Sequence, residues 1–212
     1  RHAVGRINPG DVMLIHQTRG SGAGQWELNK AAADFTGSGT FALQKPLNYS
    51  YVSNGGNEKA QILRVPQYST CNVTGTVTSL AAWNGDWGGI VAVMCRDSMT
   101  VTGAINASGA GYRGGQTGTL IDQSWSYAGE GFAAPSIKQR TANGNGGGGG
   151  KHKIGRTGGG GGGGSLYVGT NGWQTSEGND NGYGGSSVGN PELVIAVLGG
   201  GGGGGGHSDG PE

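Results

Sequence analysis

The chain has 212 residues, of which 51 are glycine, and it carries 14 Lys and Arg against 13 Asp and Glu for a net charge of +1. This balance offers no basic surface for nucleic acid or an anionic membrane, and no apolar run reaches the roughly 18 residues of a membrane span. So much glycine is typical of disordered chains, which are poor in aromatic residues, but 5 Trp and 7 Tyr favour a folded protein.

Short apolar runs between Gly, Pro and Asn turn residues predict an all-β domain over residues 1–115. Helical periodicity is nearly absent, apart from one helical turn expected over Trp26–Phe35 and ended by Gly37. The continuous apolar run Gly88–Cys95 is typical of a strand buried on both faces. The other strands predicted in this domain cover residues 11–18, 39–47, 59–65 and 71–83.

A weak repeat lies within this β-structured domain. Asn72–Ser79, with the sequence NVTGTVTS, is similar to Thr100–Ser108, with the sequence TVTGAINAS, and the shared Val-Thr-Gly recurs 28 residues later. A fixed period with one strand in each unit predicts a β-solenoid, whereas a chance match would leave a sandwich-like fold. The two cysteines, Cys71 and Cys95, can form one disulfide or remain as two buried thiols.

Residues 116–212 are the second predicted domain, in which short aromatic or apolar inserts separate long glycine runs. The runs are Gly146–Gly150, Gly158–Gly164 and Gly199–Gly206, represented by Gly148, Gly161 and Gly202. A glycine run has no side chains to bury, so an ordered run must pair its backbone groups with another segment. Polyglycine-II helices, with three residues per turn and outward N–H and C=O groups, can do this in a slab. A strand over Leu193–Leu198 is expected to anchor the last run.

The turns between the glycine segments carry basic and aromatic residues that we predict to bind a receptor. Lys151, His152 and Lys153 form a basic turn between two runs, suited to an anionic receptor such as a surface glycan. Aromatic side chains add large, rigid contact area at low entropic cost. The ones selected here are Trp125, Tyr127, Trp173 and Tyr183. The alternatives are a solvated basic turn and aromatic rings that merely cover the slab.

The sequence contains no recognisable catalytic or metal-binding motif. None of the 4 histidines has a partner at metal-ligand spacing, and CxxC, HExxH, phosphate-loop and Gly-x-Ser-x-Gly patterns are absent. The Asn/Asp/Gly segments 84–89 and 178–185 have oxygen ligands for Ca²⁺ but match plain turns better. We therefore expect no enzyme activity, no cofactor and no bound metal.

The segments GNGGGGG, TGGGGGGGS and LGGGGGGGG are separated by short aromatic inserts. In this pattern the C-terminal half resembles the receptor-binding tip adhesins of T-even-type phage long tail fibres, which implies a polyglycine-II slab whose distal loops touch a receptor. Residues 60–115 resemble a segment of large bacterial glycine-rich surface proteins. Within them, GGIVAVMC and MTVTGAINASGAGYRGG are similar to filamentous-haemagglutinin-type β-helix turns. Both resemblances imply an extracellular adhesive or structural protein.

Two functional hypotheses follow, and both place the protein at a cell surface or on a virion tail fibre. The first is an adhesin whose rigid slab displays loops that bind a cell-surface receptor or glycan. The second is a subunit of an extracellular filament or sheath, because an exposed polyglycine face has unpaired backbone groups and can pair with sibling subunits of a homo-oligomer. We also expect a processed or truncated product, since the sequence begins at Arg1 without a signal peptide.

Overall fold

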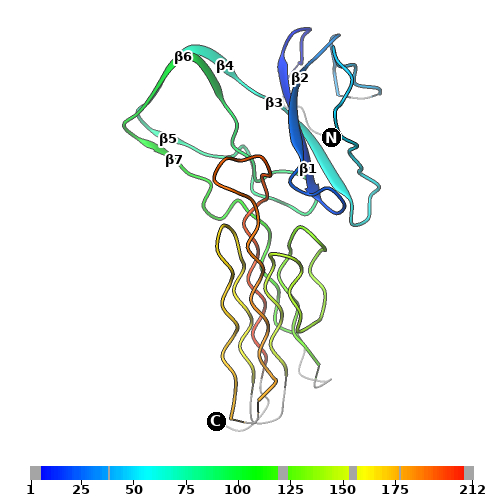
Figure 1. Cartoon of the computed structure of the whole chain (residues 1–212), viewed down its shortest axis with the longest axis vertical. Helices are drawn as coiled ribbons and strands as arrows, with labels where there is room; N and C mark the ends of the chain where they lie inside the picture. Colours follow the sequence, from blue (N-terminus) through cyan, green and yellow to red (C-terminus); the bar gives the residue numbers. More distant parts are fainter. Residues whose placement is uncertain (1–5, 38, 119–123, 153–156, 177, 208–212) are drawn as a thin grey trace.

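The computed structural model describes residues 6–37, 39–118, 124–152, 157–176 and 178–207. These residues contain short strands and no helix, which confirms the prediction of a largely non-helical chain. Within them, accordingly, no helix is long and apolar enough to cross a membrane. Figure 1 shows the strands gathered at one end of an elongated molecule, while the glycine-rich segments run side by side toward the other end.

Three antiparallel strands form the main sheet, in the order β2–β1–β3. They are β1 (Val12–Arg19), β2 (Trp26–Lys30) and β3 (Lys59–Arg64). Successive side chains of a strand point to opposite faces, so the apolar strand β1 fills two separate clusters. Met13 and Ile15 pack into one cluster, whereas Val12 and Leu14 pack into the other. The central strand is therefore buried along its whole length.

Strand β2 lies where a helical turn was expected over Trp26–Phe35, so that prediction was wrong. Its side chains alternate in burial, but the polar ones point inward, and Glu27 and Asn29 are both buried. Glu27 accepts a hydrogen bond from the N–H of Asn48 at 3.0 Å, and Asn29 donates to the carbonyl oxygen of Lys45 at 2.9 Å. Buried polar groups need such partners, and a later loop supplies them. The strand thus reverses the usual pattern, because Glu27 and Asn29 face the interior while Leu28 is 44% exposed.

Two parallel pairs of strands carry the 28-residue repeat. They are β4 (Gln67–Val73) with β6 (Met94–Val101), and β5 (Thr76–Val77) with β7 (Ala104–Ile105). The register aligns Asn72 with Thr100 and Thr76 with Ala104, so the two Val-Thr-Gly segments stack as successive turns of a solenoid would. In the described part of the chain this stack does not close into a solenoid or barrel.

A disulfide joins the two longer parallel strands. Cys71 on β4 and Cys95 on β6 are bonded, and their Cα atoms lie 5.9 Å apart, within the usual range for a disulfide. The structure thus decides between the disulfide and the two free thiols that the sequence left open. A lone pair of strands is only marginally stable, so the covalent link supports this part of the fold.

Three apolar runs that predicted strands have other structures. Only Met94 and Cys95 of the run Gly88–Cys95 belong to a strand, and residues 39–47 and 193–198 belong to none. The side chains Ile90, Val197 and Leu198 instead pack around Trp83 and Tyr112. A short apolar run predicts burial, but it does not specify a hydrogen-bonding partner for its backbone.

Backbone hydrogen bonds that recur every three residues join the glycine-rich segments. We call them the first run (Gly146–Gly150), the second run (Gly158–Gly164) and the third run (Gly199–Gly206). Every third residue from Gly200 to Gly206 donates at 2.8 Å to a carbonyl oxygen of the second run. Gly201 and Gly204 donate to a different neighbour, segment 124–132. A β-strand would alternate every two residues, so this arrangement, the glycine lattice, is not a β-sheet.

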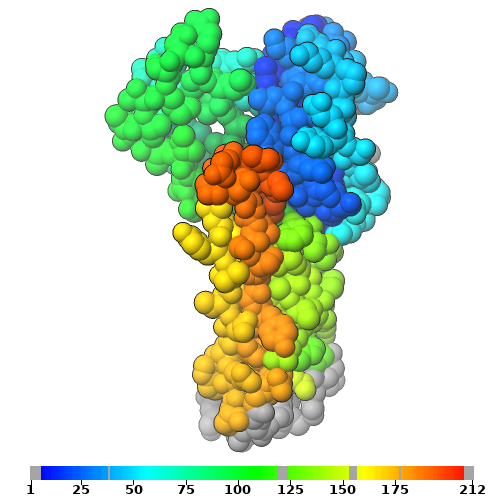
Figure 2. Space-filling view, viewed as in Figure 1, coloured from blue at the N-terminus to red at the C-terminus, as the bar shows by residue number. Residues whose placement is uncertain are grey.

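The first run lies inside the glycine lattice. Gly147 donates at 2.8 Å to the third run, Gly148 at 2.7 Å to Tyr183, and Gly149 at 2.8 Å to Gln139. A Cβ atom added to any glycine of this run would overlap a backbone atom of a neighbouring segment. The segments therefore approach too closely for side chains, and Figure 2 shows them packed as adjoining columns. The runs are folded structure and not flexible linkers.

Candidate functional site

The side chain of Arg140 lies beside two aromatic rings on one flank of the glycine lattice. Its guanidinium carbon is 4.2 Å from the centroid of the Tyr183 ring and 5.6 Å from that of Trp125. The ammonium nitrogen of Lys151 is 6.0 Å from the Trp125 ring. A cation within about 6 Å of a ring face is attracted by the electrons of the ring. We call these four residues the Arg140 cluster.

Backbone contacts of the glycine lattice position the Arg140 cluster. Trp125 and Lys151 face each other across an isolated antiparallel bridge. The N–H of Tyr183 donates to the carbonyl oxygen of Arg140 at 3.0 Å, and the carbonyl oxygen of Tyr183 accepts from Gly148 at 2.7 Å. The cluster thus combines four segments of the chain, and no local sequence spacing predicts it.

Polar contacts hold the guanidinium of Arg140 in place. Its Nε donates to the backbone carbonyl oxygen of Asn181 at 3.0 Å, and its Nη2 donates to the side-chain oxygen of the same residue at 3.1 Å. Both acceptors are neutral amides, so these two bonds orient the guanidinium and add no negative charge beside it. The adjacent Tyr183 is 39% exposed. A ligand in solvent can therefore reach an aromatic ring beside a fixed positive charge.

A second cation–ring pair extends the same flank. Tyr127 forms an antiparallel bridge with Lys138, whose ammonium nitrogen lies 5.7 Å from the Tyr127 ring centroid. The sequence search missed Lys138 and Arg140, although basic residues two apart in SIKQR would share one side of an extended segment. Alternating rings and cations can stack on sugar rings and attract carboxylate, sulfate or phosphate groups.

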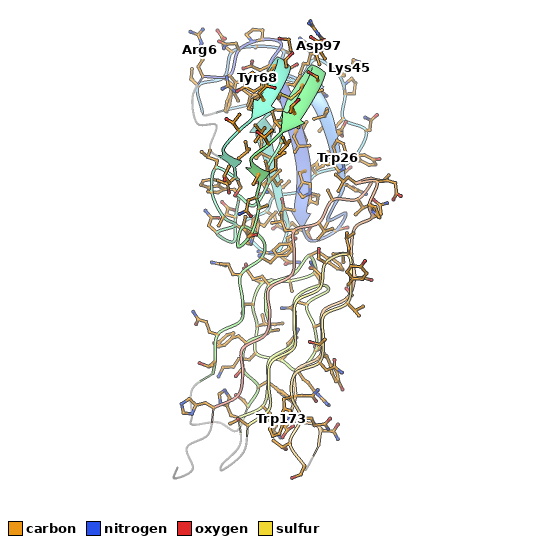
Figure 3. The ribbon with its side chains drawn as sticks, turned by 90° about the vertical axis from the view of Figure 1, so that its left-hand side faces the viewer. Arg6, Trp26, Lys45, Tyr68, Asp97 and Trp173 are labelled. Carbon is orange, nitrogen blue, oxygen red and sulfur yellow. A yellow bond between two sulfur atoms is a disulfide. The ribbon has the colours of Figure 1, made fainter. Side chains whose placement is uncertain are left out.

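The structure separates the residues that were predicted to bind a receptor. Trp125, Tyr127, Lys151 and Tyr183 share the flank described above. Trp173 is 71% exposed on segment 166–176, and Figure 3 places it near the end of the lattice that is distant from the strands. The prediction for Lys153 lies outside the described residues.

His152 is buried, so the receptor contact predicted for it does not fit the structure. It is 2% exposed, and its Nδ1 accepts a hydrogen bond from the N–H of His207 at 2.8 Å. Its Nε2 therefore carries the proton of the neutral ring and faces Ser126 Oγ at 3.1 Å. Ser126 in turn donates to the carbonyl oxygen of Gly205 at 2.6 Å. His152 thus fastens the third run to its neighbours.

A buried carboxylate connects the glycine lattice to the main sheet. Glu130 is fully buried and accepts hydrogen bonds from Arg113 Nη2 at 2.7 Å and from Trp83 Nε1 at 3.0 Å. Arg19, at the end of β1, lies 3.4 Å from the same carboxylate. The sequence does not predict this junction, because a lone glutamate in AGEGF gives no sign of its distant partners.

The charged form of Glu130 is favoured despite its burial. Burial by itself raises the pKa of the carboxyl group, but hydrogen bonds and positive charge from Arg113, with further charge from Arg19, outweigh it and lower the pKa. A second titratable group, His16 on β1, lies 2.6 Å from the carbonyl oxygen of Ala196 through its Nε2. Burial lowers the pKa of His16, so the neutral ring is favoured.

An apolar cavity of about 710 Å³ lies between β3 and the parallel strands. Its lining includes Ile62, Val73, Leu80, Ile90 and Met99. This volume falls in the range of small-molecule pockets, but the lining lacks the clustered acids and bases of an active site. In the described ranges, no three His, Cys, Asp or Glu side chains come together as metal ligands.

Comparison with known proteins gives no relative from which a role can be transferred. No protein-family model, curated protein or solved structure matches the chain. The Arg140 cluster and its second cation–ring pair are therefore interpreted from their own geometry and chemistry.

Proposed function

We propose that the protein is an extracellular adhesin that binds an anionic surface glycan through the Arg140 cluster and the Tyr127–Lys138 pair. The observation that carries this proposal is the guanidinium of Arg140, which lies 4.2 Å from the partly exposed ring of Tyr183 and donates hydrogen bonds to the neutral amide oxygens of Asn181. The ring offers a stacking surface for a sugar, and the cations attract an acidic substituent.

The glycine lattice supports this role as a rigid polyglycine-II slab. The three-residue period of its hydrogen bonds matches three residues per turn, and the bonds join separate segments, as expected for a helix without internal hydrogen bonds. A binding face on such a slab is ordered before the ligand arrives. Less conformational entropy is then lost on binding than with a flexible loop.

The proposal is tested by binding of the purified chain to a panel of acidic and neutral oligosaccharides. Tyr183→Ala removes a stacking ring, and we expect it to weaken binding of the acidic ligands at least tenfold, in line with the ~1–3 kcal/mol of an aromatic contact. Tyr167→Ala is the matched control, since Tyr167 is 85% exposed elsewhere on the lattice. That control should bind as the unmodified chain does.

Charge is tested separately with Lys138→Gln, which keeps a polar side chain of similar length. Binding should weaken for the acidic oligosaccharides and stay unchanged for neutral ones, and added salt should reduce the difference. Equal binding by Tyr183→Ala and Tyr167→Ala would contradict the proposal. So would binding that is lost only with Trp173→Ala, because Trp173 takes part in none of the cation–ring contacts of the proposed site.

A further inference from the structure

The third run leaves one line of glycines uncovered. Gly199 and Gly202 are exposed and Gly205 is half-buried, so the line follows the three-residue period. Their carbonyl oxygens accept hydrogen bonds from Tyr112 N–H, Gly115 N–H and Ser126 Oγ. Their N–H groups donate to no backbone acceptor within the described residues. We call this line the bare stripe.

The fold of one chain does not require glycine along the bare stripe. A Cβ atom at Gly199 or Gly205 would meet nothing within 4 Å, and one at Gly202 would come no closer than 3.7 Å to another atom. None of the three has the positive φ that favours glycine. Glycine at such positions only adds entropy to the unfolded chain, so an alanine would be more stable.

Other outward positions of the glycine lattice carry side chains. Arg113 and Gln116 are exposed on segment 111–118, and Thr170 and Trp173 are exposed on segment 166–176. Those residues give the lattice a polar surface in contact with water. The bare stripe differs, because it combines missing side chains with N–H groups that have no backbone acceptor among the described residues. A surface of this kind is typical of the interior of the lattice, where another segment packs against it.

The adjacent run completes the face. Gly160 and Gly163 of the second run are half-buried, and neither their N–H nor their C=O groups have a backbone partner in the described ranges. The N atom of Gly163 is 4.0 Å from the Cβ position of Gly202, so the two runs lie side by side at one surface, which we call the glycine face. In the described residues, the third run therefore contributes N–H groups without a backbone acceptor to this face, and the second run contributes N–H and C=O groups without a backbone partner, at the same three-residue period.

We propose that the glycine face is the contact face between two copies of the chain. A partner segment approaches the N–H groups of the stripe most closely where it has no Cβ atoms on its facing side, and the bare stripe of a second copy meets that condition. Donors of the stripe in one copy can then pair with carbonyl oxygens of the second run in the other. A two-fold axis satisfies both glycine faces at once.

The geometry also sets the strength of this contact. The third run has eight residues, and at a rise of about 3.1 Å per residue the glycine face is roughly 25 Å long. A face this narrow is smaller than the ~800 Å² that each partner buries in a standard interface. We therefore expect a dimer that dissociates on dilution. None of the four residues of the Arg140 cluster belongs to the bare stripe or to the second run, so the two proposals rest on different residues.

Sedimentation velocity of the full chain over a wide concentration range tests the proposal. The unmodified chain should pass from monomer to dimer, and Gly202→Val should raise the dissociation constant at least tenfold while the thermal midpoint stays the same. Gly199→Val should raise the dissociation constant in the same way, with the thermal midpoint again unchanged. Thr170→Val, an exposed change on segment 166–176, should leave the dimer intact.

The proposal would be overturned by an unmodified chain that stays monomeric at the highest soluble concentration. It would also fail if both valine variants dimerised as the unmodified chain does. If Gly202→Val lowers the thermal midpoint, Gly199→Val tests the dimer contact without that loss of stability, because its added Cβ meets nothing within 4 Å. Glycan binding by either monomeric variant reports on the Arg140 cluster separately, so the two proposals can fail independently.

Discussion

Neighbouring glycines in the third run differ in what surrounds them. A Cβ atom at Gly203 would overlap the carbonyl oxygen of Gly148, whereas Gly202 has room for one. Identical letters in a sequence cannot reveal this difference, because it arises from the segments that folding places beside every third residue. Gly148 and Gly161 are crowded as expected for structural positions, but Gly202, chosen from the sequence for the same role, is not.

This contrast predicts opposite effects for two adjacent substitutions. Gly203→Ala should lower the free energy of unfolding by about 1–3 kcal/mol, as an added group does in a tightly packed interior. Gly202→Ala should leave it unchanged or raise it by ~0.4–1 kcal/mol, because alanine reduces the entropy of the unfolded chain. Urea denaturation followed by Trp fluorescence measures both. Equal losses for the two variants would contradict the three-residue arrangement of neighbours.

At the scale of strands and helices, the sequence predicted which strands pair more reliably than it predicted the secondary structure of a segment. The Val-Thr-Gly repeat indicated stacked turns, and the register of β4 with β6 and of β5 with β7 follows its 28-residue spacing. The helical turn at Trp26–Phe35 and the strand at Leu193–Leu198 were both wrong. In each case contacts with distant residues determined the backbone conformation of the segment. Glu27 and Asn29 bind a later loop, and Val197 and Leu198 pack beside Trp83.

The parallel strands should depend on their disulfide. Cys71 and Cys95 are 24 residues apart in the sequence, and closing a loop of this length stabilises the folded state by about 3 kcal/mol in the chain-entropy description. The double variant Cys71→Ser/Cys95→Ser should therefore lose backbone amide protection in β4 and β6 by hydrogen exchange. Protection in β1, the centre of the main sheet, should persist. Unchanged exchange in β4 and β6 would show that packing alone holds them.

At the scale of the whole molecule, β1 and the glycine lattice are joined by polar contacts in a buried setting. Glu130 binds Arg113, Trp83 and Arg19, and His16 contacts Ala196 in the segment before the third run. The groups that bond to one another are at least 17 residues apart in the sequence, so the junction could not be predicted. The sequence showed that the candidate site would contain basic and aromatic residues. It did not show that they gather around Arg140, because the glycine lattice brings them together.

The junction predicts two stages of acid destabilisation. Burial keeps the pKa of His16 below its ordinary 6.5, so the unfolded chain takes up this proton first and stability starts to fall as the pH drops below 6.5. The pKa of Glu130 is below its ordinary 4.5, so its contribution is complete above that pH and is lost as the pH falls through the folded value. Urea denaturation at a series of pH values should resolve both stages.

Variants assign the stages. His16→Gln should remove the upper stage, and Glu130→Gln should remove the lower one. At neutral pH, Glu130→Gln should also cost about 3–5 kcal/mol, because it leaves the buried Arg19 without its opposite charge. Glu192→Gln is the matched control, since Glu192 is exposed, and it should change neither stage. A pH profile that is the same in all three variants would contradict the assignment.

The lack of side chains inside the glycine lattice has a thermodynamic consequence. The heat-capacity change of unfolding comes mainly from apolar surface newly exposed to water, whereas newly exposed peptide groups reduce it. A lattice held by backbone hydrogen bonds exposes many peptide groups and little hydrocarbon when it unfolds. Its heat-capacity increment should fall below the usual ~12–15 cal/mol/K per residue. The free energy of unfolding of this half of the molecule should then change only slowly with temperature, on cooling as well as on warming.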